Sequence, residues 1–249
     1  MSAAIEKPGK LSGGASITME TWQAIRLFHG RSNGDKEKDI IGLTRFAAII
    51  RPIYIASAVD DPYADTYILN IENAIDDGLA NMAEYQSEME SMISDTKTIF
   101  QCKFNIANSV EPQTLPMEFS NSLAYRGAFL LSAYDRVVKT CLTARHSGFP
   151  PAETYRIPEK AAHIVRSVFA MPTGFKYYAI TRDDVRQGVG NALEAESRMG
   201  KIPADILSGE RRSQYAPRIK RSGDDAMRVS DASNDVVIEN ASYVISGTN

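Results

Sequence analysis

The sequence predicts a mainly helical protein that carries a small antiparallel β ribbon. Most of the chain places apolar residues three and four positions apart, which is the spacing of one helix face. Two short stretches between residues 100 and 119 instead alternate apolar and polar residues, as half-buried strands do. With 249 residues, 43% of them apolar, the chain is long enough to bury a substantial core.

The N-terminal part predicts an arm and two helices. Residues 1–17 mix Lys, Gly and Ser without periodicity, so we expect a disordered arm there. A helix is predicted from Met19 to His29, since Gly30 follows the last apolar position. Residues 40–58 are apolar on most sides, which favours a helix at the centre of a bundle.

The longest predicted helix follows the turn at Pro62 and extends to about Ser94. Its apolar residues recur every seven positions, at Ile68, Ile75, Met82 and Met89. Two arrangements fit this pattern: a coiled coil, within a helical hairpin or a dimer, and a single amphipathic helix on a globular core.

Two alternating runs then predict the ribbon. The first places Phe100, Cys102, Phe104 and Ile106 against Gln101, Lys103 and Asn105. The second places Leu115, Met117 and Phe119 against Thr114, Pro116 and Glu118. Because Pro116 has no N–H to donate, the second run is restricted to an edge position. We expect the two runs to form one antiparallel ribbon.

Two helices are predicted after the ribbon. Ser120 or Asn121 can cap a helix that ends near His146, and Pro158 can open another that ends near Ala170. The ribbon and these helices make a ribbon-helix-helix-like unit over about residues 98–170, embedded in a larger helical domain over residues 18–209.

The remainder predicts a short strand over Phe175–Ile180 and a helix from Thr181, with Asp184 completing a capping box, to Met199. Residues 210–249 have no hydrophobic periodicity and are basic and then polar, which predicts a tail.

Motifs that carry catalytic chemistry are missing. The three histidines, His29, His146 and His163, lie far apart without metal-ligand spacing. Gly188 and Gly190 lack the third glycine of a dinucleotide fingerprint, and neither GxSxG nor a P-loop occurs. The sequence therefore predicts neither an enzyme nor a cofactor. Because apolar patterns surround Cys102 and Cys141, we expect buried thiols.

The charge distribution and the ribbon make a nucleic-acid partner one option. From residue 60 to 95 there are ten Asp/Glu and no Lys/Arg, whereas residues 121–221 hold 17 Lys/Arg and nine Asp/Glu. A two-stranded ribbon fits the major groove of DNA, and two copies of such a strand could pair across a dimer axis. The polar positions could equally be the solvated face of an ordinary surface strand. The candidate DNA contacts are Gln101, Lys103, Asn105, Thr114, Arg126, Arg136, Lys139, Arg145, Arg211, Arg212, Arg218, Lys220 and Arg221.

Four collinear segments carry a resemblance to a known family. They are GLTRFAAIIR (42–51), DDPYAD (60–65), the run from Leu115 to Phe149, and TRDDVRQG followed by MGKIPADILSGERRSQYAPRI between Thr181 and Ile219. The chain resembles the AcaB-like family of integrative and conjugative element proteins. The resemblance implies transcriptional regulators, activators of conjugative transfer genes, with DNA binding of ribbon-helix-helix type. The matching motif residues suit construction of the ribbon-helix unit: Phe119, Ser120, Asn121, Tyr125, Arg126, Tyr134 and Asp135.

The resemblance therefore implies a cytoplasmic homodimer that binds double-stranded promoter DNA, with RNA polymerase as a further candidate partner and no membrane. An N-terminus without the apolar stretch of a signal peptide agrees with that location. The alternative is a scaffold or accessory protein of the conjugation or integration machinery that does not bind DNA. That alternative would use the helix over residues 60–95 as its docking surface.

Overall fold

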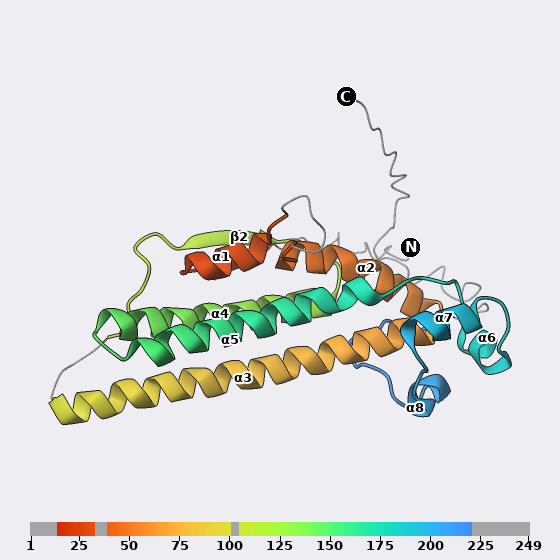
Figure 1. The fold of residues 1–249 in the computed structure, drawn as a ribbon. Helices are drawn as coiled ribbons and strands as arrows, with labels where there is room; N and C mark the ends of the chain where they lie inside the picture. The colour runs from red at the N-terminus through yellow and green to blue at the C-terminus, as the bar shows by residue number, and fades with distance from the viewer. Residues whose placement is uncertain (1–13, 33–38, 101–104, 221–249) are drawn as a thin grey trace, which may run out of the picture. The chain divides into compact units, whose positions relative to one another are not determined.

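The computed structural model describes residues 14–32, 39–100 and 105–220. These residues belong to one compact unit, Gly14–Lys220, which is mostly helical with a two-stranded antiparallel sheet (Figure 1). The elements in chain order are β1 (Ala15–Met19), α1 (Trp22–His29), α2 (Leu43–Ala58), α3 (Pro62–Phe100), β2 (Gln113–Met117), α4 (Ser122–His146), α5 (Pro151–Ala170), the 3-10 helix η2 (Met171–Gly174), α6 (Arg182–Gln187), α7 (Ala192–Met199) and α8 (Ala204–Ser208).

The core lies between three long helices, α3, α4 and α5, which run side by side (Figure 1). The heptad residues of α3, from Ile68 to Met89, are at most 1% exposed and belong to this core. The heptad face therefore packs within the chain, on α4 and α5, and is not the seam of a coiled coil between two chains. Because Ile75 and Met82 are buried, this face is not the docking surface that a scaffold would need.

The connection between α1 and α2 brings two backbone segments into direct contact. Gly30 has a φ of +76°, and a Cβ atom built on Gly42 would lie 2.3 Å from the Gly30 nitrogen. Only glycine fits such an approach, because any side chain would overlap the neighbouring backbone. This crossing directs α2 back across the core, where Phe46 stacks on Phe169 of α5 at 5.0 Å between ring centroids.

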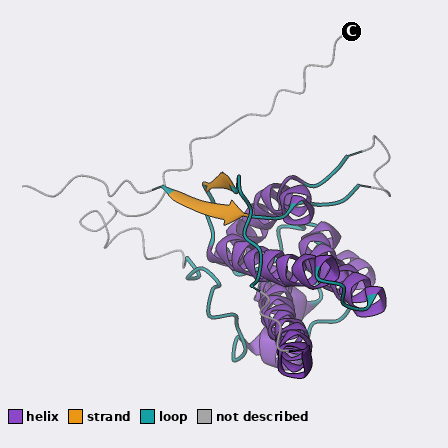
Figure 2. Cartoon of the chain, turned by 90° about the vertical axis from the view of Figure 1, so that its left-hand side faces the viewer, coloured by secondary structure: helices purple, strands orange, loops and turns teal. Residues whose placement is uncertain are grey.

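The ribbon pairs β1 with β2, two strands that are about a hundred residues apart in the chain (Figure 2). Strand β2 coincides with the second predicted run from Thr114 to Met117, but its partner differs from the prediction. Phe100 is the last residue of α3, and Asn105 and Ile106 are in no strand, so the predicted strand over residues 100–106 is wrong in its described part. The predicted disordered arm is also wrong at Ala15–Ile17, which lie in β1.

The region after α5 differs from the prediction in two places. The single helix predicted from Thr181 is two helices, α6 and α7, because Gly188 and Gly190 both adopt positive φ. The predicted capping box of Thr181 and Asp184 is confirmed. Residues 175–180 are not a strand; Tyr178 and Ile180 instead pack into a small second apolar cluster with α7 and α8 residues.

Residues 210–220 are not a tail. The Arg212 guanidinium binds the carboxylate of Asp65, with 2.8 Å between Nε and Oδ2. The Gln214 amide donates to Glu72, and the Tyr215 hydroxyl accepts from Arg126. The chain therefore folds back along α3 and α4. Among the described residues, no helix is both long enough and apolar enough to cross a membrane.

Candidate nucleic-acid interface

The two faces of the ribbon differ in chemistry. Ile17, Met19 and Met117 point inward and are part of the core, because alternate residues of a strand face opposite sides. The outward face carries the cross-strand pairs Ser16–Pro116 and Thr18–Thr114, all exposed. The hydroxyls of Thr18 and Thr114 are hydrogen bonded at 3.1 Å. This exposed face presents hydroxyl groups and one proline ring, and no charge.

Helix α4 fixes the junction between β1 and α1 through one carboxylate. Asp135 is 6% exposed and accepts the backbone N–H groups of Glu20 and Thr21, each at 2.9 Å. It also accepts the Thr21 hydroxyl at 2.6 Å. Thr21 is itself the N-cap of α1, since its Oγ1 accepts from the Ala24 N–H. The end of the strand and the start of the helix are thus tied to α4 together.

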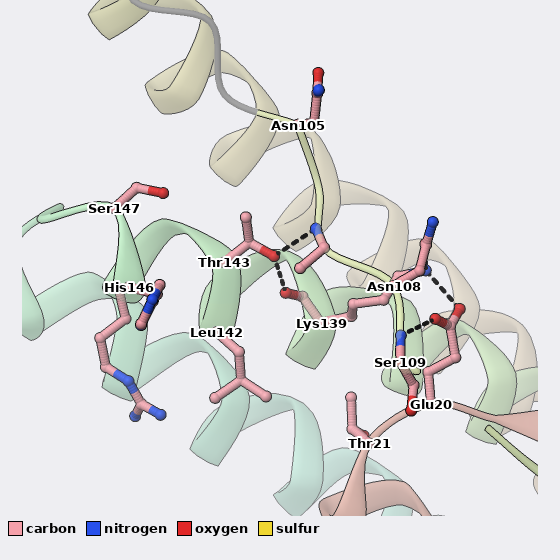
Figure 3. Close-up of a pocket in the computed structure, with 12 residues that line it drawn as sticks. Glu20, Thr21, Asn105, Asn108, Ser109, Lys139, Leu142, Thr143, His146 and Ser147 are labelled. Atoms are coloured by element: carbon pink, nitrogen blue, oxygen red, sulfur yellow. Dashed lines mark hydrogen bonds and ion pairs between the residues drawn. The ribbon is translucent and has the colours of Figure 1, made fainter. Parts of the chain in front are cut away.

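A second set of contacts joins Glu20 to α4 and to the loop that precedes β2. The Lys139 ammonium lies 2.6 Å from Glu20 Oε1, and the Ser109 N–H donates to Glu20 Oε2 at 2.9 Å (Figure 3). The hydrogen bond from Lys139, followed by that from Ser109, holds the pKa of Glu20 below its ordinary value. The Ala107 N–H donates to Thr143 Oγ1 at 3.1 Å. The loop that leads into β2 is therefore held against both α4 and the β1–α1 junction.

These ties surround a pocket of about 610 Å³ beside the ribbon (Figure 3). Its size is within the range of small-ligand sites, and most of the residues that line it are polar. The polar residues that line it are Glu20, Thr21, Asn105, Asn108, Ser109, Lys139, Thr143, Arg145, His146 and Ser147.

The base-contact candidates fall in different places. Thr114 lies on the outward face of β2. Asn105 is exposed but lies at the pocket and not on a strand. Gln101, Lys103 and the cation Arg221 lie outside the described residues.

The four cations predicted on α4 are not equivalent. Arg126 pairs with Asp76 and stacks on Tyr215, with its Cζ atom 5.0 Å from the ring centroid. Arg145 stacks on Tyr155 in the same way at 4.6 Å, and Lys139 pairs with Glu20. Arg136 is the exposed member of this set, whereas the other three are half-buried. Three of the four therefore have partners within the chain.

The basic residues after Gly209 also differ in their partners and their exposure. Arg212 is held by Asp65 and by the Ser57 hydroxyl at 2.9 Å, so it joins the C-terminal segment to α2 and α3. Arg211 lies 3.5 Å from Asp205 at the surface. Arg218 and Lys220 are exposed. Among the described members of this run, these last two are the most accessible to phosphate.

The sequence analysis missed Ser16 and Thr18. Ser16 lies in the segment that the sequence predicts to be an arm and Thr18 directly follows it, although Ile17 and Met19 alternate with them in the period of a strand. That signal covers only five residues, and the preceding residues rich in Gly, Lys and Ser outweighed it. Cys141 is buried as expected, and burial raises the pKa of its thiol to about 12; Cys102 lies outside the described residues.

Comparison with known proteins gives two matches. The family model of the transcriptional regulator AcaB matches residues 7–220. The crystal structure of selenomethionine-containing AcaB from uropathogenic E. coli is similar to this chain, with a TM-score of 0.44 and 12% sequence identity, over 80% of this chain and 95% of that one. Among curated proteins, none matches the sequence significantly. Because the family model covers most of the chain, the protein belongs to the AcaB family of transcriptional regulators.

Proposed function

We propose that the protein regulates transcription by binding double-stranded DNA, with the β1–β2 ribbon entering the major groove. The observation that carries this proposal is an exposed two-stranded antiparallel ribbon whose outward face is polar and whose ends are anchored to helices. The major groove is wide enough to admit such a ribbon. Its base edges offer both donors and acceptors, which a hydroxyl can match because it donates and accepts.

In this proposal, the residues that contact the bases differ from those that contact the phosphates. Ser16, Thr18 and Thr114 contact base edges, and the threonine methyl groups can also pack on thymine methyl groups. Because this face has no charge, phosphate contacts come from other residues. Arg136, Arg218 and Lys220 are the exposed candidates. The predicted contacts Gln101, Lys103, Asn105 and Arg221 stay predictions, as do Arg126, Lys139, Arg145, Arg211 and Arg212 despite their partners within the chain.

The resemblance noted in the sequence supports an extension of the proposal to the regulated genes. We extend the proposal to activation of conjugative transfer genes on a mobile element, in the cytoplasm, with RNA polymerase as a partner at the promoter. The ribbon itself takes both strands from one chain. A homodimer, if formed, would therefore carry two ribbons and would not share one.

Fluorescence anisotropy with promoter fragments of the protein's own element tests the proposal. We expect binding that is selective over scrambled DNA, with the logarithm of the affinity falling linearly as the logarithm of salt concentration rises. Absence of binding at about 50 mM salt, where phosphate contacts are strong, would contradict it.

A further inference from the structure

The chain contains the same succession of elements twice. Strand β1 leads into helices α1 and α2, and strand β2 leads into helices α4 and α5. The first helix after each strand has an equivalent cap: Thr21 Oγ1 accepts from the Ala24 N–H, and Asn121 Oδ1 accepts from the Ala124 N–H. The 39-residue helix α3 joins the two successions.

The two strands meet in the way that two copies of one strand would meet. They are antiparallel and pair over five positions, with Ile17 opposite Leu115 at the centre. An antiparallel pair has a local two-fold axis through its central pair. This axis relates Ser16 to Thr114 and Thr18 to Pro116. On the inner face, Ile17 is buried in the core and Leu115 packs against the same core.

We infer that one chain supplies both halves of a ribbon that a symmetric dimer would assemble from two subunits, and that this ribbon binds a DNA site that is not palindromic. The inference rests on the proposed function. A two-fold symmetric protein recognises symmetric half-sites because identical residues face each of them. Here the two halves of the ribbon present different residues to the DNA.

The difference is concentrated at one symmetry-related position. Ser16 and its symmetry mate Thr114 both offer a hydroxyl, so the two half-sites meet similar chemistry there. Of the other symmetry-related pair, Thr18 offers a hydroxyl, whereas Pro116 offers only an apolar ring. A hydroxyl can hydrogen bond to a base edge and a proline ring can only pack on it. The two ends of the site therefore differ in the base that they favour.

Cross-linking tests whether one chain forms the ribbon in solution. Thr18 and Thr114 are paired directly across the strands, so we would introduce Thr18→Cys with Thr114→Cys in a Cys102→Ser background and oxidise. Buried Cys141 serves as an internal control. We expect a disulfide within one chain, which migrates as a monomer without reductant, and no cross-link in either single variant. Covalent dimers would contradict a ribbon made by one chain.

Selection of binding sites from random duplex DNA tests the asymmetry. We expect the wild-type protein to enrich a site without two-fold symmetry. Pro116→Thr makes the two outward faces more alike, and it should raise affinity for the palindrome built from the Thr18 half-site by about tenfold or more relative to the selected site. Enrichment of a palindrome by the wild-type protein would contradict the inference alone, whereas enrichment of no sequence would contradict the proposed function itself.

Discussion

Two buried carboxylates, Asp135 and Asp65, each join segments that are far apart in the sequence, but they use different donors. Asp135 accepts two backbone N–H groups and the Thr21 hydroxyl. Asp65 accepts the Ser57 hydroxyl and the guanidinium groups of Arg182 and Arg212. Neutral donors hold the ribbon in place, whereas charged donors hold the C-terminal segment on α2 and α3.

This difference suggests that the contacts of Asp135 mainly position the ribbon, whereas those of Asp65 mainly stabilise the fold. Removal of a carboxylate from two guanidinium groups leaves the buried Arg182 with the partly exposed Asp60 as its remaining carboxylate partner, which is costlier than the loss of neutral hydrogen bonds. The Asp65 cluster lies among α2, α3 and α6, whereas Asp135 lies at the junction of β1 with α1. Stability and DNA binding should therefore respond differently to changes at the two carboxylates.

The largest expected effect is at Asp65. Asp65→Ala should lower the free energy of unfolding by about 3–5 kcal/mol, because Arg182, 4% exposed, loses a buried partner. Urea denaturation measures it. Glu88→Ala, which removes an exposed pair with Arg156, is the control and should change stability by less than about 1 kcal/mol. Equal effects of the two variants would show that the buried cluster contributes no more than a surface pair.

The next largest effect is on the pH dependence of stability, through Asp61, which lies near Asp65. Burial raises the pKa of Asp61 to about 6, and nearby Asp65 adds to this, while Arg182 and the N–H groups of Ala64 and Tyr63 oppose it. Since the folded pKa exceeds the ordinary value of 3.8, this residue contributes stability below about pH 4 that is lost as the pH rises through about 6.

Asp61→Asn stays neutral and can still cap α3. Relative to the wild type, the variant should therefore gain up to about 3 kcal/mol in unfolding free energy between pH 4 and pH 7.5. Urea denaturation at both pH values checks this. If the two proteins differ by the same unfolding free energy at pH 4 and at pH 7.5, the pKa of Asp61 in the folded state is not raised.

Asp135→Ala should have a smaller effect on stability and a larger one on DNA binding. We expect the unfolding free energy to fall by about 1–3 kcal/mol, because the N–H groups of Glu20 and Thr21 lose their acceptor. Promoter affinity should fall at least tenfold, measured where the variant is fully folded. Asp65→Ala, also measured where it is fully folded, should bind the promoter as tightly as the wild type. Weaker promoter binding by Asp65→Ala than by Asp135→Ala would contradict the comparison.

The smallest expected effect is at Lys139. Because its pair with Glu20 is partly exposed, Lys139→Gln should change stability by less than about 1 kcal/mol. The pKa of Glu20, followed by carbon NMR, should rise toward its ordinary value and remain below it, since the Ser109 N–H still donates to Glu20. An unchanged pKa of Glu20 would show that the pair does not form in solution.

The helices could be predicted where local signals mark their ends. Asn121 caps α4 and Gly148 follows its C-terminus, so both ends of that helix agree with the prediction. The capping box at Thr181 is equally local. The C-terminal end of α6 could not be predicted, because glycine within a helical pattern is compatible with both continuation and a break, and only the positive φ of Gly188 decides.

The ribbon could be predicted only in part, because strand pairing is not local. The pattern of Thr114 to Met117 identifies β2, but nothing near it in the sequence specifies a partner in Ala15–Met19. Alternation from Phe100 to Ile106 favoured a neighbouring partner instead, and α3 continues to Phe100. The antiparallel ribbon is therefore confirmed as an element with one of its two strands misplaced, and the prediction that it contacts DNA omits Ser16 and Thr18.

The central claim is that the outward face of the ribbon contacts DNA, and one substitution tests it most directly. Thr18→Glu places a carboxylate on that face, where it would repel the phosphate backbone. Ser197→Glu adds the same charge to an exposed position of α7 and is the matched control. In anisotropy titrations with the promoter fragment, we predict a loss of at least tenfold for Thr18→Glu, with unfolding free energy within about 0.5 kcal/mol of the wild type. Equal promoter affinity for Thr18→Glu, Ser197→Glu and the wild type would contradict the claim.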